Sequence, residues 1–247
     1  MVSNEIGEGT LHAARPEGGD LVDRFLEGRL RAALFGAAAE VQLGRLRLEG
    51  TLGRGAMGAI LTAFDPVLDR HVAIKSLLPG HGDDRARLLR EARLLAKLSH
   101  PNVVSIHDVI EDRDGLYLVM EQVQGGDLRA WLAQDRPAPE VLELFIQVGQ
   151  GLAAAHALGI AHCDVKPDNV VVSEGRARLI DFGLAHQPSD APSHAGTRAY
   201  LAPERVAGGG GSAAADQYAF FASLVEAIEG KRPGDGARWE RMPAWLE

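Results

Sequence analysis

Eight residues near the middle of the chain carry the pattern that decides the fold: HCDVKPDN, residues 162–169. Four shorter motifs lie around it, two upstream and two downstream. They are GRGAMG at 53–58, VAIK at 72–75, DFG at 181–183 and APE at 202–204. Each of these motifs alone occurs by chance in unrelated proteins. The five together, in this order and at these separations, indicate one selected arrangement rather than coincidence.

This set of motifs resembles that of the protein kinase family, and most closely the Ser/Thr kinases of bacteria. The resemblance covers about residues 41–230. It implies an α+β fold of two lobes, and transfer of the γ-phosphoryl group of ATP to a Ser or Thr hydroxyl of a protein substrate, with Mg²⁺ or Mn²⁺ as the cofactor. The expected domains are an N-terminal extension, first disordered and then helical, over 1–40, a lobe of strands with one main helix over 41–123, and a shortened, mostly helical lobe over 124–247.

Composition limits the classes of partner. The chain has 247 residues, and its hydrophobic content of 46% is ordinary for a globular protein. Its formal net charge is −8, so nucleic acid and anionic membranes are not expected as partners. Cys163 is the only cysteine, which excludes an internal disulfide and suits a reducing cytosol. Residues 1–16 lack the apolar core of a signal peptide, and the apolar stretch 32–39 is too short to span a bilayer, so we expect a cytoplasmic protein.

Hydrophobic periodicity predicts strands in the first lobe and helices in the second. Two strands flank the glycine motif, a third carries residues 72–75, and a turn at 112–115 joins two more. The predicted helix at 20–39, with Asp20 as its N-cap, is interpreted as an accessory helix that packs on the first lobe. The other predicted helices are 83–98, 128–133, 141–158 and 214–230, and the two later strands are 103–111 and 116–123.

The glycine motif predicts a phosphate-binding loop. Because glycine has no Cβ, the backbone at Gly53, Gly55 and Gly58 can approach a phosphate closely. A lone motif of this kind is more often a simple turn, but here apparent strands flank it and Lys75 follows at the family's spacing. The resemblance implies that ATP contacts this loop, the neighbouring strands and the segment that joins the lobes. The residues concerned are Leu52, Gly53, Arg54, Gly55, Gly58, Ile60, Ala73, Lys75, Met120, Glu121, Val123 and Val171.

Lys75 ends an apolar strand, and a buried ammonium group needs a partner or it loses its charge. The resemblance implies that Lys75 contacts the α- and β-phosphates and pairs with a glutamate of the helix over 83–98, for which Glu91 is the best candidate. The simpler interpretation of Glu91 is a solvated helix charge, and Arg90 and Arg93 offer it other partners.

The resemblance also assigns roles around the central motif. Asp164 would accept or orient the proton of the substrate hydroxyl, Lys166 would neutralise charge near the γ-phosphate, and Thr197 would bridge the two. Asn169 and Asp181 would supply an amide and a carboxylate oxygen to the metal. Hard oxygen ligands of this kind suit magnesium or manganese.

Two polar residues near the central motif are expected to have structural roles. By resemblance, His162 packs against Phe182 in a hydrophobic column that Leu95 and Ile106 complete. Metal binding by His162 is not expected, because no second soft ligand lies near it in sequence. Asp216 would cap the backbone of the catalytic loop, and the simpler alternative is a charge at a helix N-terminus.

The chain departs from the family pattern at Cys163. The family usually has an arginine there, which binds a phosphorylated residue of the activation loop. We therefore expect little activation by phosphorylation of Ser189 or Ser193. Cys163 itself is interpreted as a small buried side chain rather than a redox-sensitive thiol.

The resemblance implies several more helices after the last predicted one, but only residues 231–247 follow it in this sequence. We therefore expect either a fragment or a protein whose helical lobe is naturally minimal. A shortened lobe is expected to have low stability or to bind a protein partner over its uncovered face. The residues expected to be exposed there are Phe220, Phe221, Leu224 and Val225.

Two other functions stay open at this point. A nucleotide-binding pseudokinase or scaffold would explain the shortened lobe and Cys163, but it has no physical need to keep Asp164 and Lys166 together. A small-molecule phosphotransferase shares the metal-binding Asp and Asn residues. Such enzymes generally lack the segments present here at 196–200 and 202–204.

Overall fold

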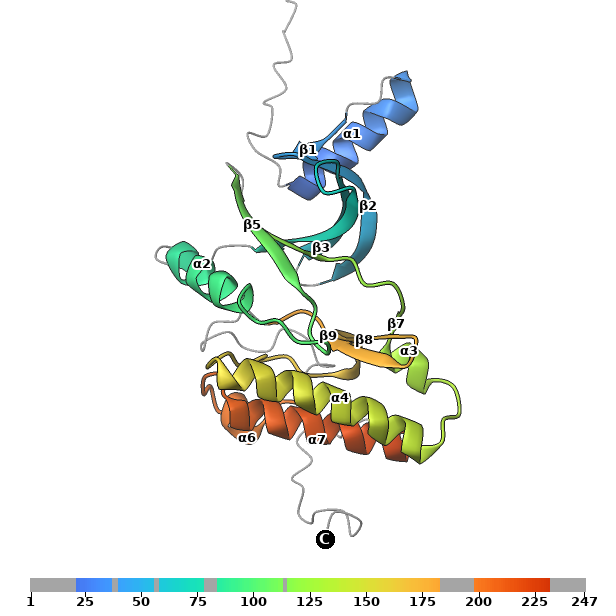
Figure 1. The fold of residues 1–247 in the computed structure, drawn as a ribbon, viewed down its shortest axis with the longest axis vertical. Coiled ribbons are helices and arrows are strands. Elements are labelled where there is room, and N and C mark those ends of the chain that lie inside the picture. Colours follow the sequence, from blue (N-terminus) through green and yellow to red (C-terminus); the bar gives the residue numbers. More distant parts are fainter. Residues whose placement is uncertain are drawn as a thin grey trace, which may run out of the picture.

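The computed structural model describes residues 21–36, 40–55, 58–77, 84–112, 115–182 and 198–231. Within them the chain forms a curled sheet at one end and a body of helices with a small sheet at the other (Figure 1). This arrangement confirms the predicted α+β fold. In the part of the chain that the structure describes, no helix has the length and apolar character needed to cross a membrane.

The larger sheet has six strands in the order β1-β2-β3-β4-β6-β5, and each neighbouring pair is antiparallel. Its strands are β1 (Gln42–Leu43), β2 (Leu46–Gly55), β3 (Gly58–Asp65), β4 (Arg70–Leu77), β5 (Ile106–Asp112) and β6 (Gly115–Glu121). The predicted strand over 103–111 starts later than expected. The reason is that Val103 leaves this sheet and forms a parallel bridge with Leu179 in the helical body.

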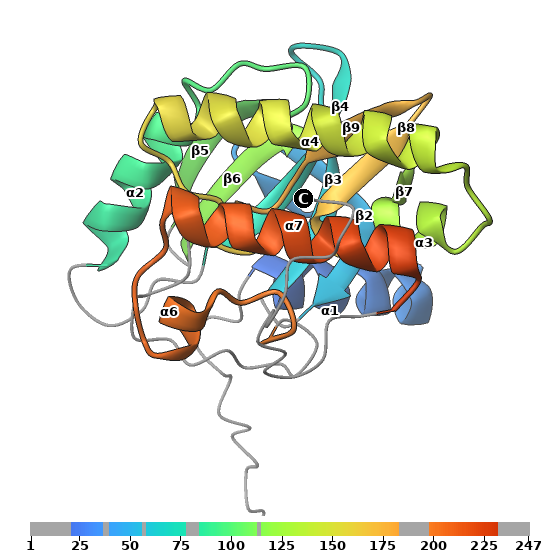
Figure 2. The same cartoon turned by 90° about the horizontal axis from the view of Figure 1, so that it is seen from below.

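Each predicted helix is present within a few residues of its expected bounds, and positions 20, 37–39 and 83 lie outside the described residues. The helices are α1 (Leu21–Phe35), α2 (Asp84–Leu95), α3 (Leu128–Leu132), α4 (Ala138–Ala157), α6 (Pro203–Val206) and α7 (Ala213–Glu229), with a 3-10 turn η1 at Pro167–Asn169. The smaller sheet contains β7 (Gly126–Asp127), β8 (Val170–Ser173) and β9 (Arg176–Leu179). Figure 2 shows α4 and α7 running side by side.

Strand β4 is buried on both faces because two different clusters cover it. Alternate side chains of a strand point to opposite faces of the sheet. Val72 and Ile74 join a cluster that includes Phe25 of α1, whereas Ala73 and Leu77 join the main core that α2 and the helical body share. The accessory role predicted for the first helix is therefore confirmed. This double cover explains the unbroken apolar run before Lys75.

Helix α7 has clear start and stop signals and a well-buried middle. The Ser212 side chain accepts a hydrogen bond from the Ala215 N–H (3.1 Å), and Gly230 ends the helix with a φ of +67°. The expectation of a broadly uncovered apolar face is wrong for two of its four residues. Leu224 and Val225 are buried, and Leu224 belongs to the core that includes α4. Of the other two, Phe220 is partly buried against that core and Phe221 is 45% exposed.

Candidate active site

The central motif forms a loop between α4 and β8, and α7 holds its backbone in place. The carboxylate of Asp216 is almost fully buried. It accepts hydrogen bonds from the backbone N–H groups of His162 (2.6 Å) and Cys163 (2.8 Å), and His156 Nε2 lies 2.8 Å from the same group. Buried backbone N–H groups need partners, so these bonds fix the loop to α7. The predicted capping role of Asp216 is confirmed.

His162 sits in the core beneath the loop. Its ring lies 4.5 Å from that of Phe182, centroid to centroid, and its Nε2 donates to the backbone oxygen of Ile180 (2.9 Å). Leu95 and Ile106 contact the same core. Complete burial lowers the pKa of His162 below its ordinary value, which favours the neutral ring. The predicted packing of His162 on Phe182 is confirmed, and the completion of the column by Leu95 and Ile106 stays a prediction.

Asp164 is brought together with two other predicted site residues. Its side chain is buried, and Oδ2 accepts hydrogen bonds from Lys166 Nζ (2.7 Å) and Asn169 Nδ2 (2.8 Å). Asn169 Nδ2 also donates to the backbone oxygen of Asp164 (2.7 Å). These three side chains therefore form one bonded cluster. Thr197, predicted to bridge Asp164 and Lys166, lies outside the described residues, as do Ser189 and Ser193.

Lys75 reaches the segment after β9 rather than α2. Its side chain is buried in β4, and Nζ lies 3.3 Å from Asp181 Oδ1. Among the described residues no group donates a hydrogen bond to Oδ1, which is a buried carboxylate oxygen. A buried acceptor in this state is costly in a folded protein, and it is a ready ligand for a cation.

The expected ion pair between Lys75 and Glu91 is not formed, which corrects the sequence prediction. Glu91 Oε1 instead lies 3.2 Å from Arg87 Nη1. Arg87 is one turn earlier on α2, and residues four apart on a helix are neighbours on its surface. The Glu91 side chain is 37% exposed, so this alternative partner holds it at the surface of the helix.

The two predicted metal ligands lie on adjoining segments. The Ile180 N–H donates to the backbone oxygen of Asn169 (3.0 Å), which ties η1 to the segment that carries Asp181. Because Nδ2 of Asn169 is bonded to Asp164, its amide oxygen is on the other side of the group. That oxygen and Oδ1 of Asp181, which accepts no hydrogen bond from the described residues, are hard ligands. They fit a Mg²⁺-type ion that takes its remaining ligands from phosphates and water.

The residues predicted to contact the nucleotide surround β3, β4 and the end of β6. Ala73 of β4 pairs with Met120 on the adjacent strand β6, and Ile60 of β3 pairs with Lys75 on β4. No atom lies within 4 Å of where a Cβ would stand at Gly53, so that side of the loop is open. Leu52 is half exposed, Val123 and Val171 are partly buried, and only the backbone of Arg54, Gly55 and Gly58 is described. Nucleotide contact by these residues stays a prediction.

Sequence reasoning missed an ion pair behind the segment that joins the lobes. Arg178 Nη1 donates to Glu121 Oε1 at 2.6 Å. The backbone of Arg178 also pairs with Val171 across β8 and β9, so this residue connects two predicted nucleotide-binding residues, one through its guanidinium and one through its backbone. Arg178 alternates with buried residues in a short strand, a pattern that gives no sign of a partner 57 residues away.

A second missed feature is a hub around Arg129 of α3. Its guanidinium donates to both carboxylate oxygens of Asp168 (2.9 and 2.8 Å), to Glu226 (2.9 Å) and to the Tyr200 hydroxyl (2.8 Å). The Tyr200 hydroxyl donates in turn to Glu226. The bond from Arg129 lowers the pKa of Asp168, while burial and the bond to Glu226 raise the pKa of Tyr200 to about 12. The hub joins α3, η1, α7 and the segment before α6.

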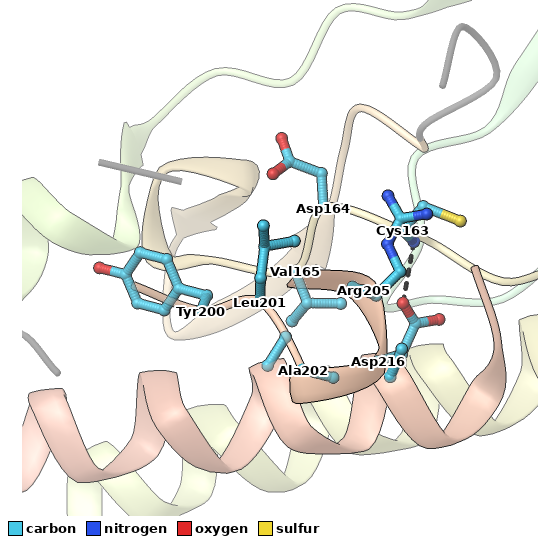
Figure 3. Close-up of a pocket in the computed structure, with 10 residues that line it drawn as sticks. Cys163, Asp164, Val165, Tyr200, Leu201, Ala202, Arg205 and Asp216 are labelled. Carbon is cyan, nitrogen blue, oxygen red and sulfur yellow. Dashed lines mark hydrogen bonds between the residues drawn. The ribbon is translucent and has the colours of Figure 1, made fainter. Parts of the chain in front are cut away.

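Cys163 lies in a pocket between the loop, α6 and α7 (Figure 3). A Cβ at Gly211 would overlap the Cys163 Sγ, so a larger residue there requires the Cys163 side chain to move. Burial, followed by the charge of Asp216, raises the pKa of the thiol to about 11. A raised pKa opposes formation of the reactive thiolate, which supports the interpretation of Cys163 as a packing residue.

Comparisons with known proteins agree with this geometry. A family model described as "Protein kinase domain" matches residues 46–241. The Ser/Thr-protein kinase PknE of Mycobacterium bovis is 39% identical over 216 residues, which cover 83% of this chain and 38% of that protein. PknA of Mycobacterium tuberculosis is 39% identical over 215 residues, covering 78% and 49%. The chain thus spans less than half the length of these curated relatives.

Solved structures give the same result. The crystal structure of the Mycobacterium tuberculosis PknI kinase domain superposes with a TM-score of 0.68 at 32% identity, covering 84% of this chain and 82% of that one. Rad53 1-466 in complex with AMP-PNP superposes with a TM-score of 0.65 at 26% identity, covering 78% and 51%. Family match, sequence identity and fold all agree, and the chain belongs to the protein kinase domain family.

Proposed function

We propose that this chain is an ATP-dependent protein Ser/Thr kinase. The observation that carries the proposal is the bonded cluster of Asp164, Lys166 and Asn169, on a loop whose backbone is fixed by buried Asp216. Its relatives' names describe Ser/Thr-protein kinases, and the Rad53 structure holds a nucleotide analogue. We expect protein substrates, with neither nucleic acid nor a membrane as partner.

In the proposed reaction, the hydroxyl oxygen of the substrate attacks the γ-phosphorus. The bond from that phosphorus to the β–γ bridging oxygen breaks, and ADP leaves with the electron pair. Asp164 orients the hydroxyl and takes its proton. Lys166, already 2.7 Å from Asp164, stabilises the negative charge that develops on the transferred group. We assign Thr197 the bridging role between them.

The negative charges of the ATP phosphates need positively charged groups to bind them. Asn169 and Asp181 would hold Mg²⁺ or Mn²⁺, which would neutralise the triphosphate and orient it. Lys75 would bind the α- and β-phosphates, and Glu91 would pair with Lys75 once it leaves Arg87. The adenine would lie between Ala73, Met120 and Val171, with the glycine loop over the phosphates.

One observation favours a second candidate, a nucleotide-binding scaffold without transfer activity. Lys75 contacts Asp181 and Glu91 contacts Arg87, so the two residues are not paired for transfer in this structure. The scaffold proposal requires that these pairings persist when nucleotide binds.

Transfer of labelled γ-phosphate from Mg-ATP to a basic protein substrate distinguishes the two candidates. We expect label on Ser or Thr from the wild-type chain and none from Asp164→Asn, while both bind ATP. A folded wild-type chain that binds ATP but transfers no phosphate would contradict the kinase proposal and support the scaffold. Equal transfer by Asp164→Asn would contradict the role of Asp164.

A further inference from the structure

An apolar patch lies on the outer side of the α4–α7 pair. Four large apolar side chains there are about half exposed: Leu142 (43%) and Ile146 (61%) on α4, and Phe221 (45%) and Ile228 (39%) on α7. Single exposed apolar residues are ordinary, but a contiguous set on one face marks a binding surface. We call these four residues the α4–α7 patch.

The four side chains face the same way. Phe145 of α4 packs edge-on against Phe220 of α7, with ring centroids 5.6 Å apart, and a second contact joins the end of α4 to the start of α7. The helices are therefore antiparallel, as Figure 2 shows. In two antiparallel right-handed helices, the residue after each contact residue turns to the same side, which places Ile146 beside Phe221. The other two patch residues lie one and two turns away on the same stripes.

The chain leaves α7 beside this patch. Because the helices are antiparallel, the end of α7 lies along the first half of α4. Ile228 of α7 and Leu142 of α4 are therefore at the same end of the helix pair. The next residues, RPGDGARWERMPAWLE at 232–247, lie outside the described residues. Their first part is rich in Gly and Pro, which suits a reversal of direction. Their second part carries four large apolar residues, which are Trp239, Met242, Trp245 and Leu246.

We propose that residues 239–246 bind across the α4–α7 patch of the same chain. Trp239, Met242 and Leu246 recur at i, i+3 and i+7, and charged Glu240 and Arg241 lie between the first two. Pro243 prevents one continuous helix through the segment and suits the first turn of a short helix that carries Trp245 and Leu246. An amphipathic segment of this kind fits an apolar surface between two helices. The extended chain from Gly230 to Trp239 spans up to about 30 Å. Since α7 is about 26 Å long, the segment reaches every part of the patch.

A second copy of the chain fits the patch less well. Even if each patch residue offered the area of an aromatic side chain, about 150–250 Å², four half-exposed side chains would present at most roughly 400–500 Å². A stable interface needs about 800 Å² from each partner. A segment of the same chain binds with much less area, because its effective concentration is in the millimolar range.

Tryptophan fluorescence tests the proposal on the full chain. The tryptophans are Trp131, Trp239 and Trp245, so Trp131→Phe leaves both reporters in the segment. We expect their emission at shorter wavelength than that of a peptide of residues 232–247, with weaker quenching by acrylamide, at every protein concentration. Equal emission and quenching in protein and peptide would overturn the proposal. A shift that appears only as concentration rises, together with dimers in light scattering, would overturn it in favour of a contact between copies.

Charged substitutions in the patch locate the binding surface. In the Trp131→Phe background, we expect Ile146→Glu and Phe221→Glu to move the emission to that of the peptide. The matched control is Leu30→Glu on α1, whose native side chain is 59% exposed, close to the 61% of Ile146. It should leave the emission unchanged. Circular dichroism checks that each variant is folded, and if Phe221→Glu fails this check, Ile146→Glu carries the test. Unchanged emission in folded Ile146→Glu would contradict the proposed surface.

Discussion

The 162–169 loop and the side of the large sheet that we propose binds nucleotide are held in different ways. The loop is fixed by buried hydrogen bonds from its backbone to Asp216 of α7, and by bonds within the loop from Lys166 and Asn169 to Asp164. On the nucleotide side, Glu91 is bonded within its own helix, and the contact of Lys75 lacks hydrogen-bond geometry.

This difference has an energetic meaning. Breaking a buried hydrogen bond and leaving its partner unsatisfied costs about 1–3 kcal/mol, whereas a surface pair four residues apart on a helix contributes only ~0.3–0.5 kcal/mol. The loop is therefore set by the fold itself. The pairing of Glu91 can change at small cost, for example when a nucleotide draws Lys75 away from Asp181.

The largest expected effect is that of Asp164→Asn. We expect kcat for phosphoryl transfer to fall by about 10²–10⁴ because the proton acceptor is lost. The dissociation constant for ATP should stay nearly unchanged, since Asp164 belongs to the loop and not to the nucleotide side. Steady-state kinetics and calorimetry measure the two quantities. Asp135→Asn, which changes an exposed carboxylate, is the control, and an equal fall in both variants would contradict the assignment.

Removal of the anchor beneath the loop comes next. Asp216→Ala leaves two buried backbone N–H groups and His156 without their acceptor, and we expect the free energy of unfolding to fall by about 3 kcal/mol. Urea titration measures the loss. Gln217→Ala, an exposed neighbour on α7, should change it little. If both variants lose the same amount, Asp216 does not anchor the loop.

Acid should weaken the loop region through His162. Burial puts its folded-state pKa below the unfolded value of about 6.5, so between these values only the unfolded chain binds the proton. Stability from this group is present above pH 6.5 and is lost as pH falls, by up to ~1.4 kcal/mol per pH unit. Urea titrations at several pH values should show a shallower slope for His162→Phe than for wild type. An unchanged slope in His162→Phe would refute this origin.

The smallest effect is expected at the surface pair of α2. Arg87→Ala frees Glu91, and we expect kcat/KM for ATP to rise about twofold, the equivalent of ~0.4 kcal/mol. Arg90→Ala, which removes an exposed arginine from the same helix, is the matched control. A fall in kcat/KM that is specific to Arg87→Ala would show that this arginine supports the site instead of competing for Glu91.

Apolar spacing in the sequence was enough to locate the five longer helices, but not the short helix α6. The two-lobe fold and the roles of Asp164, Lys166 and Asn169 came from the family resemblance, and the structure brings these three side chains together. The capping role of Asp216 followed from family resemblance alone.

Side-chain contacts between residues far apart in the sequence could not be predicted from local sequence patterns. Arg129 bonds to Glu226, which lies 97 positions later in the sequence, and Arg178 bonds to Glu121, which lies 57 positions earlier. The residues that flank these two arginines in the sequence do not distinguish them from the other arginines of the chain. The partner of Lys75 was predicted wrongly for another reason. Two carboxylates can serve it, and the choice depends on how α2 lies against the sheet, which the sequence does not encode locally.

Hydrogen exchange of the wild-type chain, with and without Mg²⁺ and a non-hydrolysable ATP analogue, tests most directly whether the fold itself sets the loop. We predict that the backbone N–H groups of His162 and Cys163 are strongly protected in both states, while protection in α2 rises only with nucleotide. Rapid exchange at His162 and Cys163 without nucleotide, followed by protection on binding, would contradict it.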